Sequence, residues 1–152
     1  MKIRKFGPFR AVGAYAKTSY SLEQSPETAK ISQLEFGFFE QWFGGLIPHR
    51  LDRCEWFHLT TDYETDEFGS FTYIIGHRVW QFDTIPEGMM AIEMPRQGYA
   101  VFNVDLDHDI PCTETKLEIT RFFQDTTKYR RAYTTDLIIS NRSEIRYFVS
   151  IE

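Results

Sequence analysis

An order of predicted elements that occurs twice is the feature that most constrains the fold of this chain. In the first half, a stretch rich in Val, Tyr and Phe predicts a strand over 9–16. Ser25-Pro26-Glu27 combines an N-cap residue, a proline at the first helical position and an acid in the first turn. With an apolar stripe at three- and four-residue steps and Gly44-Gly45 as its end, this predicts a helix over 26–43. Two strands are expected next, at 54–60 and 71–80.

The second half repeats this order. A short edge strand is predicted over 89–94, a strand over 99–104, a helix over 113–126, and strands over 133–139 and 144–151. We therefore predict an α+β fold with two pseudo-symmetric β-α-β-β halves, which form antiparallel sheets with a helix packed on each and a ligand cleft at their junction. One domain over 1–152 is expected, with its halves at about 1–85 and 86–152.

Charge and aromatic content limit the partners. The 152 residues carry a net charge of −5, so a phosphate backbone would be repelled, and direct nucleic-acid binding is not expected. The 14 Phe, 8 Tyr and 3 Trp favour an apolar or cationic small molecule instead. No run of apolar residues is long enough to cross a membrane and the N-terminus lacks a secretion signal, so we expect a cytoplasmic protein.

Metal and cofactor motifs are not found. Cys54 and Cys112 lack metal-ligand spacing and are interpreted as free thiols, and the four His are not paired at metal-binding intervals. The loop at 105–109 resembles the start of a calcium loop, but Ile110 and Lys116 stand where the glycine and the last glutamate are needed. The sequence thus predicts neither metal nor cofactor.

Asp136 is the strongest candidate for a functional residue. It lies in mid-strand beside apolar neighbours, where Asp is uncommon and an unpaired buried carboxylate is costly. Glu55 holds a comparable place in the first half, so a two-fold repeat would bring the two acids to opposite walls of one cleft. Trp56 would stack on a ligand there, with Tyr73 and Trp80 as weaker candidates; the alternatives are a solvent-facing acid and a tryptophan of the core. The basic run at 128–131 is interpreted as a helix C-terminal region or a contact for an acidic protein partner.

Four short stretches in this order resemble the GyrI-like effector-binding family, the sensing domain of many AraC- and MerR-type regulators. They are Phe9-Arg10-Ala11-Val12-Gly13, Tyr73-Ile74-Ile75-Gly76-His77, Met94-Pro95-Arg96-Gln97-Gly98-Tyr99-Ala100-Val101-Phe102 and Thr135-Asp136-Leu137-Ile138-Ile139. The glycine before Tyr99 stands one place later than in the family pattern. Asp136 replaces the usual glutamate, and Ile138 the usual tyrosine. The resemblance implies the sensing domain standing alone.

The resemblance and the composition together predict a small-molecule-binding protein that is not an enzyme. Its ligand would be flat, hydrophobic and cationic, held by Asp136, Glu55, Trp56, Tyr99, Tyr73 and Trp80. One alternative is a small hydrolase, with Asp136 or Glu55 as general base and Tyr99 as proton donor. Another is a protein-interaction module that inhibits an enzyme such as gyrase. Oligomeric state and ligand identity stay open at this point.

Overall fold

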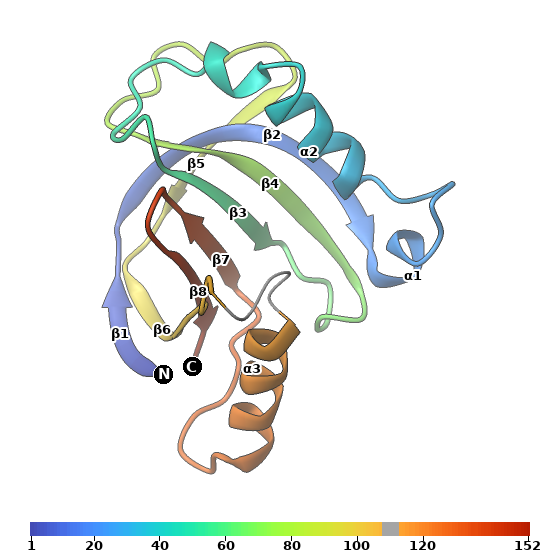
Figure 1. Ribbon diagram of the computed structural model, residues 1–152, viewed down its shortest axis with the longest axis vertical. Coiled ribbons are helices and arrows are strands. Elements are labelled where there is room, and N and C mark those ends of the chain that lie inside the picture. Colours follow the sequence, from blue (N-terminus) through green and yellow to red (C-terminus); the bar gives the residue numbers. More distant parts are fainter. Residues whose placement is uncertain (108–112) are drawn as a thin grey trace.

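The computed structural model describes residues 1–107 and 113–152, and in this part of the chain eight strands form one antiparallel sheet (Figure 1). Cys112 and the second part of the calcium-like loop, with Ile110, lie outside the described residues. The elements are β1 (Lys2–Phe6), β2 (Phe9–Ser19), α1 (Tyr20–Glu23), α2 (Ile31–Phe39), the 3-10 helix η1 (Phe43–Leu46), β3 (Trp56–Thr61), β4 (Ser70–Val79), β5 (Met89–Met94), β6 (Gln97–Asn103), α3 (Thr113–Asp125), β7 (Thr135–Ser140) and β8 (Ile145–Ser150).

The strand order is symmetric about the centre of the sheet. It runs β1-β6-β8-β7-β3-β4-β2-β5. From the centre outwards, β7, β8 and β6 of the second half mirror β3, β4 and β2 of the first, and β1 and β5 add one strand at each edge. At the centre β3 and β7 pair antiparallel, with Leu59 opposite Leu137. The α+β fold with two pseudo-symmetric halves is confirmed, and the two predicted sheets are continuous because β3 and β7 pair through backbone hydrogen bonds at the junction.

The sheet curves so that side chains on one of its faces pack against each other. Residues of β2, β3, β4, β6, β7 and β8 form a single apolar cluster on this face, and Phe6, Met90, Ile92 and Met94 pack against it. Phe6 precedes the turn that joins β1 to β2, and its ring lies 5.0 Å from that of Phe148 on β8. Both ends of the sheet thus contribute to one core.

The opposite face carries the two helices. Ile31, Leu34 and Phe38 of α2 pack on β2 and β4, while Ile119, Phe122 and Phe123 of α3 pack on β6 and β8. These side chains recur at three- and four-residue steps, which places them on one side of each helix. The central strands β3 and β7 lie between the two packing sites and form the middle of the floor of the cavity described below.

A pair of glycines allows close strand contact beneath α2. Gly13 of β2 lies opposite Gly76 of β4. A Cβ atom added at Gly76 would lie 2.1 Å from the carbonyl oxygen of Val12, and one added at Gly13 would lie 2.5 Å from that of Ile75. No side chain fits at such distances, so these positions need glycine for space.

Candidate functional site

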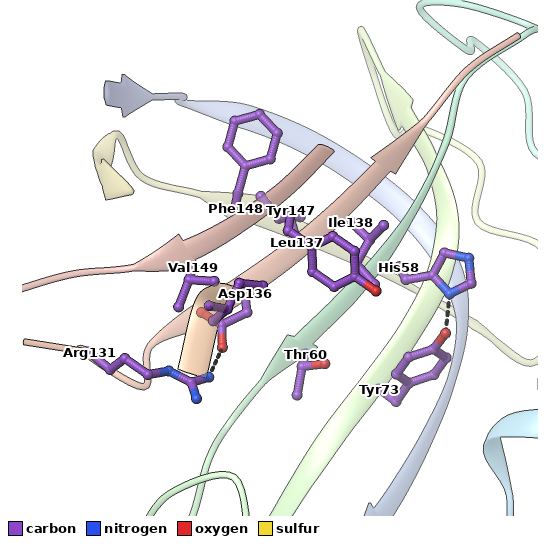
Figure 2. A pocket seen from close by; sticks show the side chains of 11 residues that line it. His58, Thr60, Tyr73, Arg131, Asp136, Leu137, Ile138, Tyr147, Phe148 and Val149 are labelled. Atoms are coloured by element: carbon purple, nitrogen blue, oxygen red, sulfur yellow. Dashed lines mark hydrogen bonds and ion pairs between the residues drawn. The ribbon is translucent and has the colours of Figure 1, made fainter. Parts of the chain in front are cut away.

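A cavity of about 180 Å³ lies over the junction of the two halves, on the helix-bearing face (Figure 2). Two rows of side chains from neighbouring strands form its floor: Asp136, Thr60 and Tyr73 in one row, and Tyr147, Ile138 and His58 in the other. The lining also includes Ile119 of α3, Arg131, and Leu137, Phe148 and Val149 of β7 and β8. Figure 2 shows Asp136 and Arg131 at one end, Thr60 near the middle, and His58 and Tyr73 at the other end.

Asp136 forms the charged end of the cavity together with Arg131. Its Oδ2 accepts hydrogen bonds from Arg131 Nη2 at 2.8 Å and from the hydroxyl of Tyr63 at 2.6 Å. Its Oδ1 accepts from the backbone N–H and the hydroxyl of Ser150, at 2.8 and 3.1 Å. The carboxylate is thus engaged on both oxygens, and its charge is matched by Arg131.

Burial shifts the ionisation of this group of residues. It acts to lower the pKa of Arg131, but the Asp136 carboxylate outweighs it and holds that pKa above its ordinary value. Burial, with the charge of Asp136, raises the pKa of Tyr63. Tyr63 therefore stays neutral, and its hydroxyl donates a hydrogen bond to the carboxylate.

His58 and Tyr73 form the other end, and they continue to Glu35, which lines a separate hollow beside α2. Tyr73 donates a hydrogen bond to Glu35 Oε1 of α2 at 3.2 Å, and His58 Nδ1 forms a hydrogen bond with the Tyr73 hydroxyl. Burial lowers the pKa of His58 to about 4, so the ring is neutral at neutral pH. Because the Tyr73 hydroxyl donates its hydrogen to Glu35, the Tyr73 oxygen accepts a hydrogen bond from His58 Nδ1–H. The neutral His58 ring then has Nε2 free of hydrogen, as an acceptor. Burial, followed by the charge of Glu35, raises the pKa of Tyr73.

The rings at the floor follow the pseudo-two-fold symmetry. Leu59 pairs with Ile74 in the first half, and Leu137 pairs with Phe148 in the second. Tyr73 and Tyr147 each precede these partners by one position, so they occupy equivalent places in the two halves.

A second hollow of about 200 Å³ lies beyond Arg131. Arg131 and Ile119 line both hollows, and Glu67, Phe123 and Tyr133 line only the second. Arg131 Nη1 lies 3.6 Å from Glu67 Oε2, and its guanidinium carbon lies 4.6 Å from the centre of the Tyr133 ring. Arg131 therefore forms a wall between the two hollows.

Two of the six residues predicted from the sequence, Asp136 and Tyr73, line the cavity. The structure brings them into the same row, on either side of Thr60. The ring of the first half that meets Asp136 is Tyr63, rather than the expected Trp56. Trp56 pairs opposite Ser140, further along β3, where its ring contacts Phe39 of α2 at 5.6 Å.

The other three predicted residues lie outside this cavity. Glu55 precedes β3 and binds Arg78 through both oxygens, at 2.6 and 2.8 Å. Tyr99 is fully buried on the opposite face of the sheet, beside Phe6 and Phe148, and burial raises its pKa to about 12. Trp80 follows β4 and packs on His49 at the far end of the sheet.

His58, rather than Glu55, is the counterpart of Asp136. Leu59 lies opposite Leu137 at the centre of the sheet, so the pseudo-two-fold axis passes between them. This axis relates the residue before Leu59, His58, to the residue before Leu137, Asp136. Glu55 was placed in the cleft from its position near the start of the strand. Counting back one residue from the leucine of each central strand would have identified His58.

Besides His58, sequence reasoning missed residues from loops, from α2 and from the second half's last strand. Arg131 belongs to a basic run interpreted as a helix C-terminal region, yet its guanidinium turns towards Asp136. Tyr147 lies in the alternating pattern of the last strand, and equivalence to Tyr73 is the signal that would have found it. For Glu35 and Tyr63 the sequence carries no local signal, because their contacts join elements that are distant in the chain.

No group of three or more His, Cys, Asp or Glu side chains gathers as a metal site among residues 1–107 and 113–152. None of the helices in this described part is both long and apolar enough to cross a membrane.

Comparison with known proteins identifies the family. A family model described as integron-associated effector binding protein matches residues 2–145. No curated protein sequence matches this chain. The solved structure of the integron cassette protein VCH_CASS2 from the mobile metagenome of Vibrio cholerae is similar with a TM-score of 0.76 and 21% identity, covering 99% of this chain and 95% of that one.

A second solved structure, that of SAV2435 bound to tetraphenylphosphonium, is similar with a TM-score of 0.74 and 11% identity. The match covers 99% of this chain and 93% of that one. At these identities the two structures support the fold, and the match of the family model over nearly the whole chain supports the family. The chain belongs to the integron-associated effector-binding proteins, a GyrI-like family whose members bind small molecules.

Proposed function

We propose that this protein binds a hydrophobic, aromatic cation in the cavity between α2 and α3. The observation that carries the proposal is the composition of this cavity. The rings of Tyr73 and Tyr147 lie on its floor, Asp136 lies at one end, and Glu35 lies just beyond the other end, in contact with Tyr73. Arg131 is the only cationic side chain among the described lining residues, and it is paired with Asp136.

This arrangement suits a delocalised cation for two reasons. The faces of tyrosine rings attract positive charge, most strongly where water is excluded. Asp136 at one end and Glu35 just beyond the other, with a single arginine, leave the surroundings of the site net negative, which disfavours an anion of the same shape. The binding of tetraphenylphosphonium by SAV2435, which has the same fold, supports this ligand class.

The size of the cavity sets a further condition. Its volume of about 180 Å³ is below the roughly 300–1,000 Å³ of pockets that hold drug-sized ligands. A ligand with several rings must therefore displace side chains at the cavity wall. A second hollow of about 200 Å³, which shares Ile119 and Arg131 with the cavity, provides adjoining space for such a movement.

A matched pair of ions tests the proposal. Tetraphenylphosphonium and tetraphenylborate have almost the same shape and opposite charge, so their affinities measured by calorimetry compare charge alone. We expect the phosphonium to bind and the borate to bind at least tenfold more weakly. Equal affinity for both ions, or no binding of the phosphonium, would contradict the proposed function.

A bulky substitution locates the site. Ile138 lies on the floor of the cavity, whereas Leu51 is 53% exposed and lies elsewhere. We expect Ile138→Trp to abolish phosphonium binding and Leu51→Trp, the matched control, to leave it unchanged. Loss of binding in both variants, or in neither, would show that the ligand lies outside this cavity.

The hydrolase alternative would use Asp136 or Glu55 as general base and Tyr99 as donor. Asp136 already accepts hydrogen bonds on both oxygens, Glu55 is paired with Arg78, and Tyr99 lies on the opposite face. We therefore expect no saturable turnover from a panel of activated esters, lactones and strained-ring compounds. Turnover that disappears in Asp136→Asn would favour the hydrolase.

The remaining alternative is a module that inhibits an enzyme such as gyrase. We expect supercoiling by purified gyrase to be unaffected by the protein, both without and with tetraphenylphosphonium. Inhibition at micromolar protein would favour the interaction module over the small-molecule binder.

A further inference from the structure

Asp136 lines the cavity, and a second carboxylate, Glu35, lies just outside it and accepts a hydrogen bond from the lining residue Tyr73. The two acids differ in how their charge is matched. Asp136 lies 2.8 Å from Arg131 Nη2 and accepts three further hydrogen bonds, from Tyr63 and Ser150. A ligand without hydrogen-bond donors, such as a tetraaryl cation, cannot replace these bonds. The exchange of Arg131 for such a ligand would leave buried donors unsatisfied, which is costly.

Glu35 is in a different situation. Its Oε1 accepts one hydrogen bond, from Tyr73, and the nearest basic group among the described residues is His58 Nδ1 at 3.9 Å. Burial lowers the pKa of His58 to about 4, so this ring carries no charge at neutral pH. The charge of Glu35 is therefore unmatched on the described part of the chain, although its side chain is only 41% exposed.

A third carboxylate, Glu67, lies behind Arg131 and lines only the second hollow. Arg131 stands between Glu67 and the cavity, and its guanidinium contacts both acids. The field of Glu67 is thus shielded from a ligand that rests on the cavity floor.

We propose that Glu35, rather than Asp136, supplies the negative charge that selects a cation at this site. The cationic centre then lies at the α2 end of the cavity, on the rings of Tyr73 and Tyr147 and on the side nearest to Glu35. Tyr73 positions Glu35 through its hydroxyl and meets the ligand with its ring. Tyr73 and Asp136 are two strands apart, so this position is roughly 10 Å from the Asp136 end. This inference rests on the proposed function, and it assigns the cation to one end of the same cavity.

The variant Glu35→Gln tests the assignment, because glutamine keeps the shape and the acceptor for Tyr73 and removes only the charge. Its matched control is Glu40→Gln, which makes the same change in net charge at an exposed position at the end of the same helix. We expect Glu35→Gln to weaken tetraphenylphosphonium binding about tenfold, as for a partly exposed charge at close range. Glu40→Gln should change it less than twofold, and neither variant should weaken tetraphenylborate.

Three outcomes separate this inference from the proposed function. If the wild-type protein does not bind tetraphenylphosphonium, the proposed function fails and the inference with it. If the wild type binds and Glu35→Gln binds equally well, the inference alone is wrong. If both variants weaken binding alike, a general charge effect is responsible and the assignment to Glu35 is again wrong.

Two measurements keep the test independent of how well Glu35→Gln folds. Tyr73→Phe retains the ring and removes the hydroxyl that positions Glu35, so we expect an intermediate, roughly threefold loss of phosphonium affinity. A crystal structure of the wild-type complex should place the phosphorus nearer to the Glu35 carboxylate than to that of Asp136. The opposite placement would overturn the assignment.

Discussion

The substitution Asp136→Asn gives the most direct test of the charged end of the cavity. The side chains of Arg131 and Asp136 are 19% and 16% exposed, and their nitrogen and oxygen lie 2.8 Å apart. Asparagine keeps the shape and one oxygen for Ser150, but it leaves the arginine without this counter-charge. Removal of one partner from a buried pair costs about 3–5 kcal/mol. Because Glu67 stays 3.6 Å from Arg131, we expect the lower end of this range.

The double variant Asp136→Asn/Arg131→Met separates the loss of the pair from the loss of the acid. Removing both charges avoids an unmatched buried arginine, and well-packed replacements of buried pairs are often close to neutral. In urea unfolding followed by tryptophan fluorescence, we expect the double variant to recover at least about 2 kcal/mol relative to Asp136→Asn. If the two single effects instead add to within about 0.5 kcal/mol, the residues do not act as a pair, and this account of the site is refuted.

Ligand affinity provides the second measurement on the same variants. Asp136→Asn alone should weaken tetraphenylphosphonium binding by about 1 to 2 kcal/mol, since the unmatched charge of Arg131 then repels a cation in the cavity. The double variant removes that charge and should bind almost as well as the wild type. Equally weak binding by the single and the double variant would mean that Asp136 itself attracts the ligand.

Three further predictions concern stability. Gly76→Ala should cost about 1–3 kcal/mol or more in urea unfolding, because the added Cβ would meet the Val12 carbonyl at 2.1 Å, whereas Gly45→Ala, with no atom within 4 Å, should cost less than about 1 kcal/mol. Burial lowers the pKa of His58 from 6.5 to about 4, so as the pH falls the unfolded chain takes up a proton before the folded one. The free energy of unfolding should therefore fall by up to roughly 3 kcal/mol from pH 6.5 to pH 4, and His58→Gln should remove this part of the loss. The Glu23 carboxylate accepts the backbone N–H groups of Lys30 and Ile31 at the start of α2, so Glu23→Gln should lower stability by about 1–2 kcal/mol and Glu27→Gln by less than about 0.5 kcal/mol. Equal effects of the two substitutions would contradict this capping role.

The start of α2 shows where local sequence signals stop being sufficient. Ser25-Pro26-Glu27 predicts a helix from 26, but residues 25–29 form a turn and α2 begins at Ile31. The carboxylate of Glu23 accepts the backbone N–H groups of Lys30 and Ile31 at 2.8 and 3.2 Å. Burial acts to raise the pKa of Glu23, but these bonds and one from Thr18 outweigh it and lower that pKa. A cap from seven residues upstream thus replaces the local one.

The end of α2 and the first strand were misjudged for similar reasons. The apolar spacing extends to Trp42, yet α2 ends at Phe39, Trp42 takes a left-handed conformation with φ of 59°, and the two glycines lie in η1. The strand β1, at Lys2–Phe6, was not predicted, because its exposed basic side chains carry no apolar face. Its pairing with β6 is a long-range contact that no local window contains.

Strand positions and faces were predicted well where alternation decides them. The strand over 89–94 was predicted at its observed bounds, and the placement of Asp136 on the face of Ile138, opposite to that of Leu137 and Ile139, agrees with the cavity lining and the core. The site itself was predicted only in part. Alternation shows which face a residue occupies, but which side chains meet across that face depends on the register between β3 and β7, and this register joins residues far apart in the sequence.

The exchange of leading strands between the halves has a consequence for how the chain is made. Lys2 pairs with Val101, and β5 of the later part pairs with β2 of the earlier part, so neither half completes its sheet alone. At synthesis rates of about 5–20 residues per second, β1 waits roughly 5 to 20 seconds for β6. During this time its backbone is an open edge that another nascent chain could pair with. Charged side chains on an edge strand disfavour such pairing, and Lys2, Arg4 and Lys5 place three positive charges on β1 during this interval.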